Sequence, residues 1–263
     1  IFFWVARMIM FGMEFQNKEP FKNIYVHALV RDEKGQKMSK SKGNVIDPLE
    51  LIEKYSADAL RFTLLSMASP GRDVKLSEDR VKGYRNFLNK IWNANNFLIQ
   101  NDCKFENIET PNDLKLNINK WIFVEFTNTN EKIKKSIDSY RFDEAARIAY
   151  QFVWHSFCDW YLELSKTVFY SENNENIEET RNVASFIFTQ ILVILHPFIP
   201  FLTEEIWLKN KLDKDGKDFL MLKNWSEAIS NKDKDSDEVN EIIEFVSSIR
   251  SFKNEIEISP GSF

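Results

Sequence analysis

Residues 30–44 read VRDEKGQKMSKSKGN, a lysine-rich stretch with a glycine near each end. Lys37, Lys40 and Lys42 stand among small hydroxyl residues. Glycine lets a backbone turn sharply and come close to a ligand, and flexible ammonium groups can follow the oxygens of a phosphate chain. The composition therefore suits a loop that binds a polyphosphate. The alternative, from composition alone, is a solvated and charged turn.

The segments before this loop predict one buried helix and one strand. Residues 2–15 carry large apolar side chains at helical spacing, among them Trp4, which predicts a mostly buried helix. Residues 24–30 are apolar and β-branched, which predicts a short buried strand in a parallel sheet. His27 is the only strongly polar member of that strand. We expect it to be structural, because no carboxylate or nucleophile accompanies it.

Beyond the loop the sequence becomes helical. Asp47 can cap a helix that begins at Pro48, Glu50 can reach back to close a capping box, and a second helix starts at Ser56. Later helical segments begin near residue 77 and span 121–137, 142–169, 180–207 and 239–252, with a break at 196–200. The aromatic residues of the 142–169 segment are expected in the core. The alternative is a platform on which RNA bases stack.

Two polar segments separate these helices. Residues 101–119 are asparagine-rich and contain Pro111, so they are expected to form a linker. Residues 209–237 are highly charged and predict a solvated linker or hairpin.

The charge of the chain is unevenly distributed along its 263 residues. Residues 1–95 contain 16 Lys and Arg against 11 Asp and Glu, a net charge of +5, and the remainder has a net charge of −10. A protein that binds a polyanion needs a local basic patch and not a basic total. The overall net charge of −5 is therefore compatible with an RNA partner.

The sequence gives no sign of export or of a membrane span. No apolar run approaches the roughly 20 residues that a transmembrane helix needs, and no secretory signal is visible. Cys103 and Cys158 form neither a disulfide framework nor a zinc-ligand spacing, which fits a reducing cytosol. The chain starts at Ile1 without an initiator methionine, which we interpret as a cut inside a longer protein. We expect a cytoplasmic protein with no membrane partner.

Several stretches of the sequence resemble class I aminoacyl-tRNA synthetases. The run Lys37-Met38-Ser39-Lys40-Ser41 is similar to the second signature of this class, the KMSKS signature. Within the class, the stretches most similar to valyl-tRNA synthetases are FFWVARM at residues 2–8, GQKMSKSKGNVIDP at residues 35–48 and CDWYLELSK at residues 158–166. The likeness extends from residue 2 to beyond residue 207.

This resemblance implies a mainly α fold. A C-terminal remnant of a Rossmann-like α/β catalytic domain is then followed by a helical-bundle anticodon-binding domain. The implied divisions are the end of the catalytic domain with its signature loop at 1–46, a helical stem-contact region at 47–100, a linker at 101–119, the anticodon-binding bundle at 120–225, and a charged linker with the start of a C-terminal region at 226–263.

The resemblance also implies a reaction and its participants. Valine is activated by ATP to valyl-adenylate and passed to tRNA(Val), with Mg²⁺ accompanying the ATP, in a protein expected to be a monomer. Lys37 and Lys40 are the implied catalytic residues, which neutralise the charge of the departing pyrophosphate, and Lys40 is the first choice. The implied ATP-binding residues are Lys37, Met38, Ser39, Lys40 and Ser41. The likeness assigns no metal ligand in the protein and no anticodon-reading residue.

Some features of the family are missing from this sequence. It has no His-x-Gly-His signature, which in the family holds the ATP phosphates from the other side. None of His27, His155 and His196 lies in such a setting. The family's editing domain is absent as well. We therefore expect this chain alone to be inactive in aminoacylation.

Two other interpretations remain open. The chain is alternatively a non-catalytic tRNA-binding module, which binds tRNA with a steep salt dependence and without ATP–pyrophosphate exchange. It is otherwise part of an isoleucyl- or leucyl-tRNA synthetase. FWVAR at residues 3–7 favours the valyl enzymes, because the isoleucyl enzymes usually have an Arg-Gly-Trp-Phe pattern there.

Overall fold

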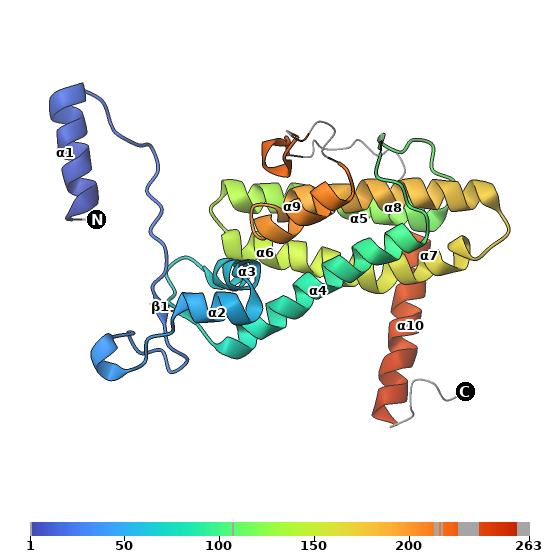
Figure 1. The fold of residues 1–263 in the computed structure, drawn as a ribbon, viewed down its shortest axis with the longest axis horizontal. Helices are drawn as coiled ribbons and strands as arrows, with labels where there is room; N and C mark the ends of the chain where they lie inside the picture. Colours follow the sequence, from blue (N-terminus) through green and yellow to red (C-terminus); the bar gives the residue numbers. More distant parts are fainter. Residues whose placement is uncertain (1, 107, 213–215, 217, 226–236, 257–263) are drawn as a thin grey trace.

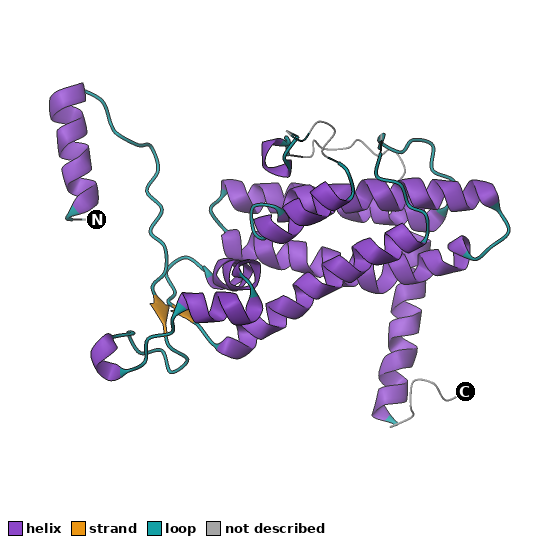
Figure 2. Ribbon diagram, viewed as in Figure 1, coloured by secondary structure: helices purple, strands orange, loops and turns teal. Residues whose placement is uncertain are grey.

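A computed structural model describes residues 2–106, 108–212, 216, 218–225 and 237–256 of the chain (Figure 1). These residues are mainly helical, with one short pair of strands (Figure 2). The elements in chain order are α1 (Trp4–Gln16), β1 (Val30–Arg31), η1 (Lys40–Lys42), α2 (Pro48–Tyr55), α3 (Ala57–Met67), β2 (Val74–Lys75), α4 (Glu78–Gln100), α5 (Asn117–Asp138), α6 (Phe142–Gln151), η2 (Phe152–Tyr161), α7 (Leu162–Phe169), α8 (Asn174–Leu195), α9 (Pro200–Lys209), η3 (Leu220–Leu222) and α10 (Asp237–Glu255).

The helices form an elongated bundle, which confirms the predicted mainly α fold (Figure 1). The elements α6, η2 and α7 follow one another without a break, and η2 has the wider hydrogen-bonding pattern of a π-helix. Helix α5 packs on both α6 and α8, and α3 packs on α4 and α6. The long predicted helix over 142–169 is therefore present, and it forms the middle layer of the bundle.

One continuous apolar core joins these helices. It extends in sequence from Leu51 in α2 to Val239 in α10, and α8 contributes most of its apolar side chains to it. In the 142–169 segment Phe152, Phe157 and Tyr161 are buried, which confirms that these aromatic residues belong to the core and do not form a stacking platform. Burial of such large side chains is the main favourable contribution to folding.

The predicted helix starts after the loop are confirmed. The Asp47 carboxylate accepts a hydrogen bond from the Leu49 backbone N–H at 2.8 Å, and Pro48 occupies the first helical position. The Ser56 hydroxyl accepts from the Ala59 N–H at 3.2 Å and caps α3. The capping box through Glu50 is not observed in the described residues.

The predicted break at residues 196–200 separates α8 from α9, and a buried carboxylate supports the new helix. Asp58 of α3 accepts hydrogen bonds from the backbone N–H groups of Phe201 at 3.3 Å and Leu202 at 2.6 Å. These groups lie in the first turn of α9, where a helix has no internal acceptors for them. Burial raises the pKa of Asp58 even though these two hydrogen bonds favour its charged form. The contact joins α3, close to the loop in sequence, to the first turn of α9.

A buried polar network joins α5, η2 and α8 within the core. The Tyr161 hydroxyl donates to Asn119 Oδ1 at 2.9 Å. Asn119 Nδ2 donates in turn to Glu179 Oε1 at 2.9 Å and to Thr180 Oγ1 at 3.1 Å. Complete burial raises the pKa of Tyr161 well above its ordinary value, so its hydroxyl stays protonated as a donor. The network fixes how these three elements meet.

Two predictions for the first 30 residues are wrong in part. Helix α1 forms, but none of its residues is buried, and Trp4 is 73 % exposed. The strand is limited to Val30–Arg31, which pairs in parallel with Val74–Lys75, and residues 24–27 are exposed. An apolar helix face or a strand is buried only where another layer covers it, and the described residues provide no such layer here. Figure 1 shows α1 standing apart from the bundle.

The structure describes the first predicted linker almost completely and the second only in part. Cys103 and Phe105, inside the 101–119 segment, are buried against the bundle, and α5 already begins at Asn117. Of the charged segments, residues 213–215, 217, 226–236 and 257–263 lie outside the described residues. The proposed domain divisions therefore stay predictions.

Three further features of the described residues concern membrane spans, cysteines and metal ligands. Within the described ranges, none of the helices has the length and apolar character needed to cross a membrane. Cys103 and Cys158 are free and buried, and burial raises the pKa of each thiol to about 12. No group of three or more His, Cys, Asp or Glu side chains in the described part of the chain is arranged to hold a metal ion.

We predict that Tyr161→Phe lowers the free energy of unfolding by about 1–2 kcal/mol, because it leaves the buried Asn119 carbonyl oxygen without its donor. Urea denaturation followed by circular dichroism measures this change. Tyr170→Phe is the matched control, because Tyr170 is 76 % exposed and the same substitution there should change stability by less than about 0.5 kcal/mol. Equal effects of the two substitutions would contradict the role assigned to the network.

Candidate nucleotide-binding loop

The lysine-rich loop begins with a tight backbone turn after β1. The Gly35 N–H donates to the Asp32 carbonyl at 2.9 Å, and the Asp32 N–H donates to the Gln36 carbonyl at 3.1 Å. Gly35 has a φ of +76°, and a Cβ there would come within 3.0 Å of the Lys75 side chain. The positive φ favours glycine at this position, whereas the flexible end of the Lys75 side chain can shift to make room for a Cβ. The turn brings Lys37 opposite Arg31, with which it forms an isolated antiparallel bridge.

The signature residues follow this turn and end in a short 3₁₀ helix. Ser39 is extended, and residues Lys40–Lys42 form η1, which stops at Gly43 with a φ of +65°. The hydroxyls of Ser39 and Ser41 lie 3.3 Å apart. This geometry places both hydroxyls on one side of the loop, beside the lysines.

Asn44 holds the two ends of the loop together. Its Oδ1 accepts from the Ser39 backbone N–H at 3.0 Å, and its Nδ2 donates to Asp32 Oδ2 at 2.8 Å and more weakly to the Lys37 carbonyl at 3.3 Å. The other oxygen of Asp32 accepts from the Gln36 N–H at 2.6 Å. The hydrogen bond from Asn44, together with that from Gln36, holds the pKa of Asp32 below its usual value. The contact therefore persists at neutral pH and weakens only as the pH falls through that lowered pKa.

Apolar contacts seat the loop on the helical core. Met38, in the middle of the signature, and Ile46, just after it, are partly buried against the core cluster. Their neighbours Lys37 and Lys40 are exposed. Met38 therefore packs its thioether against the core, while the lysines on either side of it keep their ammonium groups in solvent.

The signature lysines carry charge that the protein does not neutralise. Lys37, Lys40 and Lys42 form no ion pair with any described residue, whereas the nearby Arg31 pairs with Asp73. An exposed ammonium group without a carboxylate partner remains available to an incoming anion.

A cavity of about 820 Å³ lies elsewhere in the bundle, and the cavity beside the loop measures about 630 Å³. The cavity beside the loop is lined by Lys34 and Lys42, and Lys37 and Lys40 do not line it. Its carboxylates come from Asp32, Glu33, Asp47, Glu50 and Glu78. This excess of negative charge opposes a polyphosphate inside the cavity. Lys37 and Lys40 are exposed and lie outside this acidic cavity.

The sequence analysis found the lysines of the loop but missed the residues that shape it. The structure brings Lys37, Met38, Ser39, Lys40 and Ser41 together on one loop, as expected. It leaves Trp4 exposed on the separate helix α1. Asn44 and Asp32 were not singled out. The sequence feature that could have identified them is an asparagine directly after Gly43 together with an aspartate at the start of the same loop.

Two family models match the chain. The model described as the anticodon-binding domain of tRNA ligase matches residues 119–262, and the model described as tRNA synthetases class I (I, L, M and V) matches residues 1–77. The first covers more than half of the chain. The two matches account for the helical bundle and for the signature loop, respectively.

Solved structures share this fold at low sequence identity. The ternary complex of LeuRS, tRNA and LeuAMS from Agrobacterium radiobacter K84 superimposes with a TM-score of 0.67 at 19 % identity, over 85 % of this chain and 26 % of that chain. Methionyl-tRNA synthetase of Mycobacterium tuberculosis, in complex with methionyl-adenylate, gives a TM-score of 0.54 at 18 % identity, over 68 % of this chain and 36 % of that chain. At these identities the likeness concerns the fold alone.

Curated relatives are much closer in sequence. The valine–tRNA ligase of Pelagibacter ubique is 69 % identical over the whole chain, which spans 30 % of that relative. The valine–tRNA ligase of Mesorhizobium japonicum is 48 % identical over the whole chain, which spans 28 % of it. The chain thus covers about three tenths of the length of these relatives. Its loop, its helical bundle and these matches agree: the chain belongs to the tRNA ligase family that has this anticodon-binding domain, and it is similar in sequence to valine–tRNA ligases.

Proposed function

We propose that this chain is part of a valine–tRNA ligase, in which the signature loop assists the activation of valine by ATP and the helical bundle binds tRNA(Val). The observation that carries the proposal is the state of Lys37 and Lys40, two exposed and unpaired ammonium groups on a loop whose ends are tied by Asn44. The names of the relatives support valine as the amino acid. The finer assignments of a monomer and a cytoplasmic location belong to the same proposal.

The chemistry of activation needs what this loop offers. The carboxylate of valine attacks the α-phosphorus of ATP, the bond to the bridging oxygen breaks, and pyrophosphate leaves with the negative charge. The acyl group then moves from the adenylate to a hydroxyl of the terminal ribose of tRNA. Lys37 and Lys40 would contact the departing phosphates, with Ser39 and Ser41 as neutral donors beside them. Mg²⁺ would enter with ATP, since the described residues form no metal site.

A second candidate function is a non-catalytic tRNA-binding module. The sequence has no His-x-Gly-His signature, so this chain offers only one side of a phosphate site. The match of residues 119–262 to an anticodon-binding domain favours tRNA binding for the chain by itself. The two candidate functions are compatible if this chain is enough for tRNA binding and a longer protein is needed for catalysis.

We predict that Lys40→Ala, in a full-length enzyme that carries this sequence, lowers the rate of adenylate formation about 10²-fold and leaves valine affinity nearly unchanged. A pre-steady-state activation assay measures the rate, and equilibrium binding measures the affinity. Lys42→Ala is the matched control, because Lys42 lies on the same turn and lines the acidic cavity. A near-normal rate for Lys40→Ala would contradict the assignment of Lys40.

We predict that Asn44→Asp loosens the loop, because it loses the donor to Asp32 and sets two carboxylates against each other. Limited proteolysis by trypsin after Lys37 and Lys40 should become about fivefold faster, as expected when one hydrogen bond is lost.

The double variant Asn44→Asp with Asp32→Asn exchanges donor and acceptor and provides the control. It restores the contact between the two side chains and keeps acceptors for the backbone N–H groups of Gln36 and Ser39. Proteolysis should return to the original rate. A double variant that is cleaved as fast as the single variant would show that this contact does not hold the loop.

We predict that the purified 263-residue chain binds tRNA but catalyses neither ATP–pyrophosphate exchange nor aminoacylation. The affinity for tRNA should fall steeply as the salt concentration rises, because phosphate contacts release counterions. Anisotropy of labelled tRNA measures binding, and exchange of labelled pyrophosphate measures catalysis. Turnover by this chain alone would contradict the prediction, and absence of tRNA binding would remove the proposed partner.

A further inference from the structure

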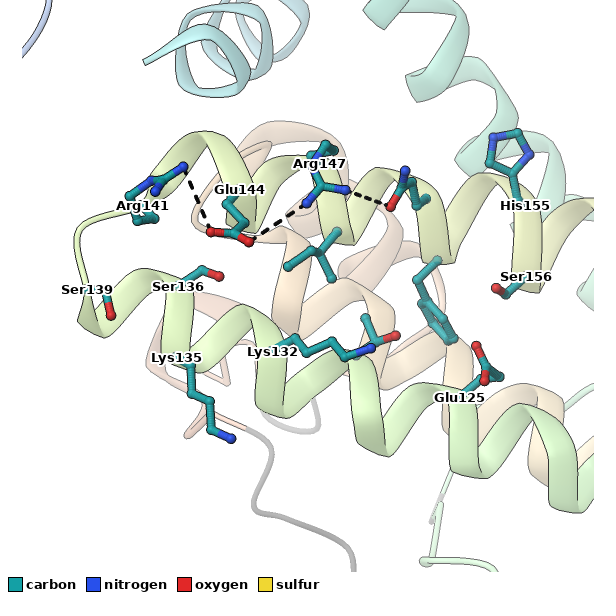
Figure 3. Close-up of a pocket in the computed structure, with 14 residues that line it drawn as sticks. Glu125, Lys132, Lys135, Ser136, Ser139, Arg141, Glu144, Arg147, His155 and Ser156 are labelled. Atoms are coloured by element: carbon teal, nitrogen blue, oxygen red, sulfur yellow. Dashed lines mark hydrogen bonds and ion pairs between the residues drawn. The ribbon is translucent and has the colours of Figure 1, made fainter. Parts of the chain in front are cut away.

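One corner of the bundle, where α5 turns back into α6, contacts the segments that precede both strands. We call residues 139–143 the α5–α6 corner. Figure 3 shows the turn between Ser139, which follows the last residue of α5, and Arg141, which precedes α6. The corner is far from the signature loop in sequence, so its contacts with the strand segments are tertiary.

Tyr140, in this corner, has a backbone conformation that favours glycine. Its φ is +58°, and it is the only aromatic residue with a positive φ in the part of the chain that the structure describes. The Arg141 N–H donates to the Ser136 carbonyl at 2.8 Å, and the Tyr140 N–H donates to the Ile137 carbonyl at 2.9 Å. These two bonds form the Schellman motif at the end of α5, in which glycine is the usual residue at the position of Tyr140. Since glycine would form the same turn without strain, the reason for a tyrosine lies in the contacts of its ring.

The ring of Tyr140 contacts the segment that precedes β1. Tyr25 lies against Tyr140 with 5.9 Å between ring centroids and an angle of 26° between the rings. It also meets Phe142 edge-on, at 5.4 Å and 71°. Both arrangements are favourable for aromatic pairs. Tyr25 is five positions before Val30, the first residue of β1, so the corner holds the chain shortly before it pairs with β2.

A hydrogen bond from the same corner holds the segment that precedes β2. The Ser69 hydroxyl donates to Asp143 Oδ2 at 2.6 Å, and Arg141 Nε donates to Asp143 Oδ1 at 3.3 Å. Burial acts to raise the pKa of Asp143, but the hydrogen bonds from Ser69 and Arg141 outweigh burial and lower this pKa. The carboxylate is therefore ionised at neutral pH and accepts both bonds. Ser69 is five positions before Val74, the first residue of β2.

The strand pair connects these two attachments to the start of the signature loop. Strand β1 pairs in parallel with β2, and Arg31 of β1 forms an ion pair with Asp73, directly before β2. The Lys75 side chain passes beside Gly35 in the first turn of the loop. The α5–α6 corner thus fixes the strands from which the loop departs.

We propose that Tyr140, together with Tyr25, is a positioning residue for the transfer of the acyl group to tRNA: it fixes how the chain enters the signature loop relative to the bundle. The inference rests on the proposed function, in which the loop assists activation of valine and the bundle binds tRNA(Val). Transfer needs the two parts in one geometry, because the end of the bound tRNA has to reach the adenylate. Activation without tRNA does not depend on this geometry. Tyr140 acts through the strand pair and contacts neither substrate.

The test uses a full-length enzyme that carries this sequence, because this chain lacks the His-x-Gly-His signature. Tyr140→Asn removes the ring and keeps the turn, since asparagine adopts a positive φ more readily than most residues. It should lower the single-turnover rate of transfer from valyl-adenylate to tRNA(Val) about tenfold. The rate of ATP–pyrophosphate exchange without tRNA and the affinity for tRNA should each change by less than about twofold.

Two further substitutions at tyrosines are the controls. Tyr140→Phe keeps the ring and should transfer at nearly the rate of the unaltered enzyme. Tyr170→Asn removes a ring that is 76 % exposed after α7, and it should leave all three quantities unchanged.

Tyr25→Ala tests the same contact from the other side and leaves the turn between α5 and α6 intact. It should slow transfer to the same extent as Tyr140→Asn, again without a change in activation. The double variant Tyr25→Ala with Tyr140→Asn should be no slower than either single variant, because both remove one shared contact. Losses that add in the double variant would contradict that shared contact. If Tyr140→Asn does not fold, as judged by thermal unfolding, Tyr25→Ala decides the test.

The outcomes separate this inference from the proposed function. If the unaltered enzyme does not attach valine to tRNA(Val), the proposed function fails and this inference fails with it. If the unaltered enzyme is active and the variants without a ring at position 25 or 140 transfer at its rate, only this inference fails. A parallel loss of activation, tRNA affinity and transfer would show a purely structural role and would also overturn it.

Discussion

The position of the signature loop depends on the apolar core that runs from α2 to α10. Met38 and Ile46 pack against this core on either side of the 3₁₀ turn, so the loop is seated on the same layer that holds the helical bundle together. The Asp58 contact to the first turn of α9 extends this connection across the bundle.

Charged groups and apolar side chains are distributed differently in this structure. The core residues are shared by the bundle helices, whereas Lys37, Lys40 and Lys42 of the loop are cations without an ion-pair partner among the described residues. Carboxylates line the cavity beside the loop and leave its open side positive. An acidic protein can in this way bind a polyanion locally while its total charge limits non-specific binding.

The sequence was informative wherever the determining contacts are local. Helix starts at Asp47 and Ser56 and the break near Pro200 were predicted correctly, since a cap or a proline acts within a few residues. The burial of α1 was predicted wrongly, because periodicity shows which face is apolar and not what covers it. The tie between Asn44 and Asp32 spans 12 positions, and the Asp58 contact joins α3 to α9. Contacts of this kind are not visible in a linear sequence.

The central claim is that Lys37 and Lys40 are exposed cations held ready for the phosphates of ATP. The most direct measurement is a crystal structure of a full-length enzyme carrying this sequence with ATP and a non-reactive valine analogue bound. The account predicts that the Nζ atoms of both lysines lie within about 3 Å of oxygens of the β- or γ-phosphate. A structure in which both lysines remain in solvent, while other residues alone hold the phosphates, would contradict it.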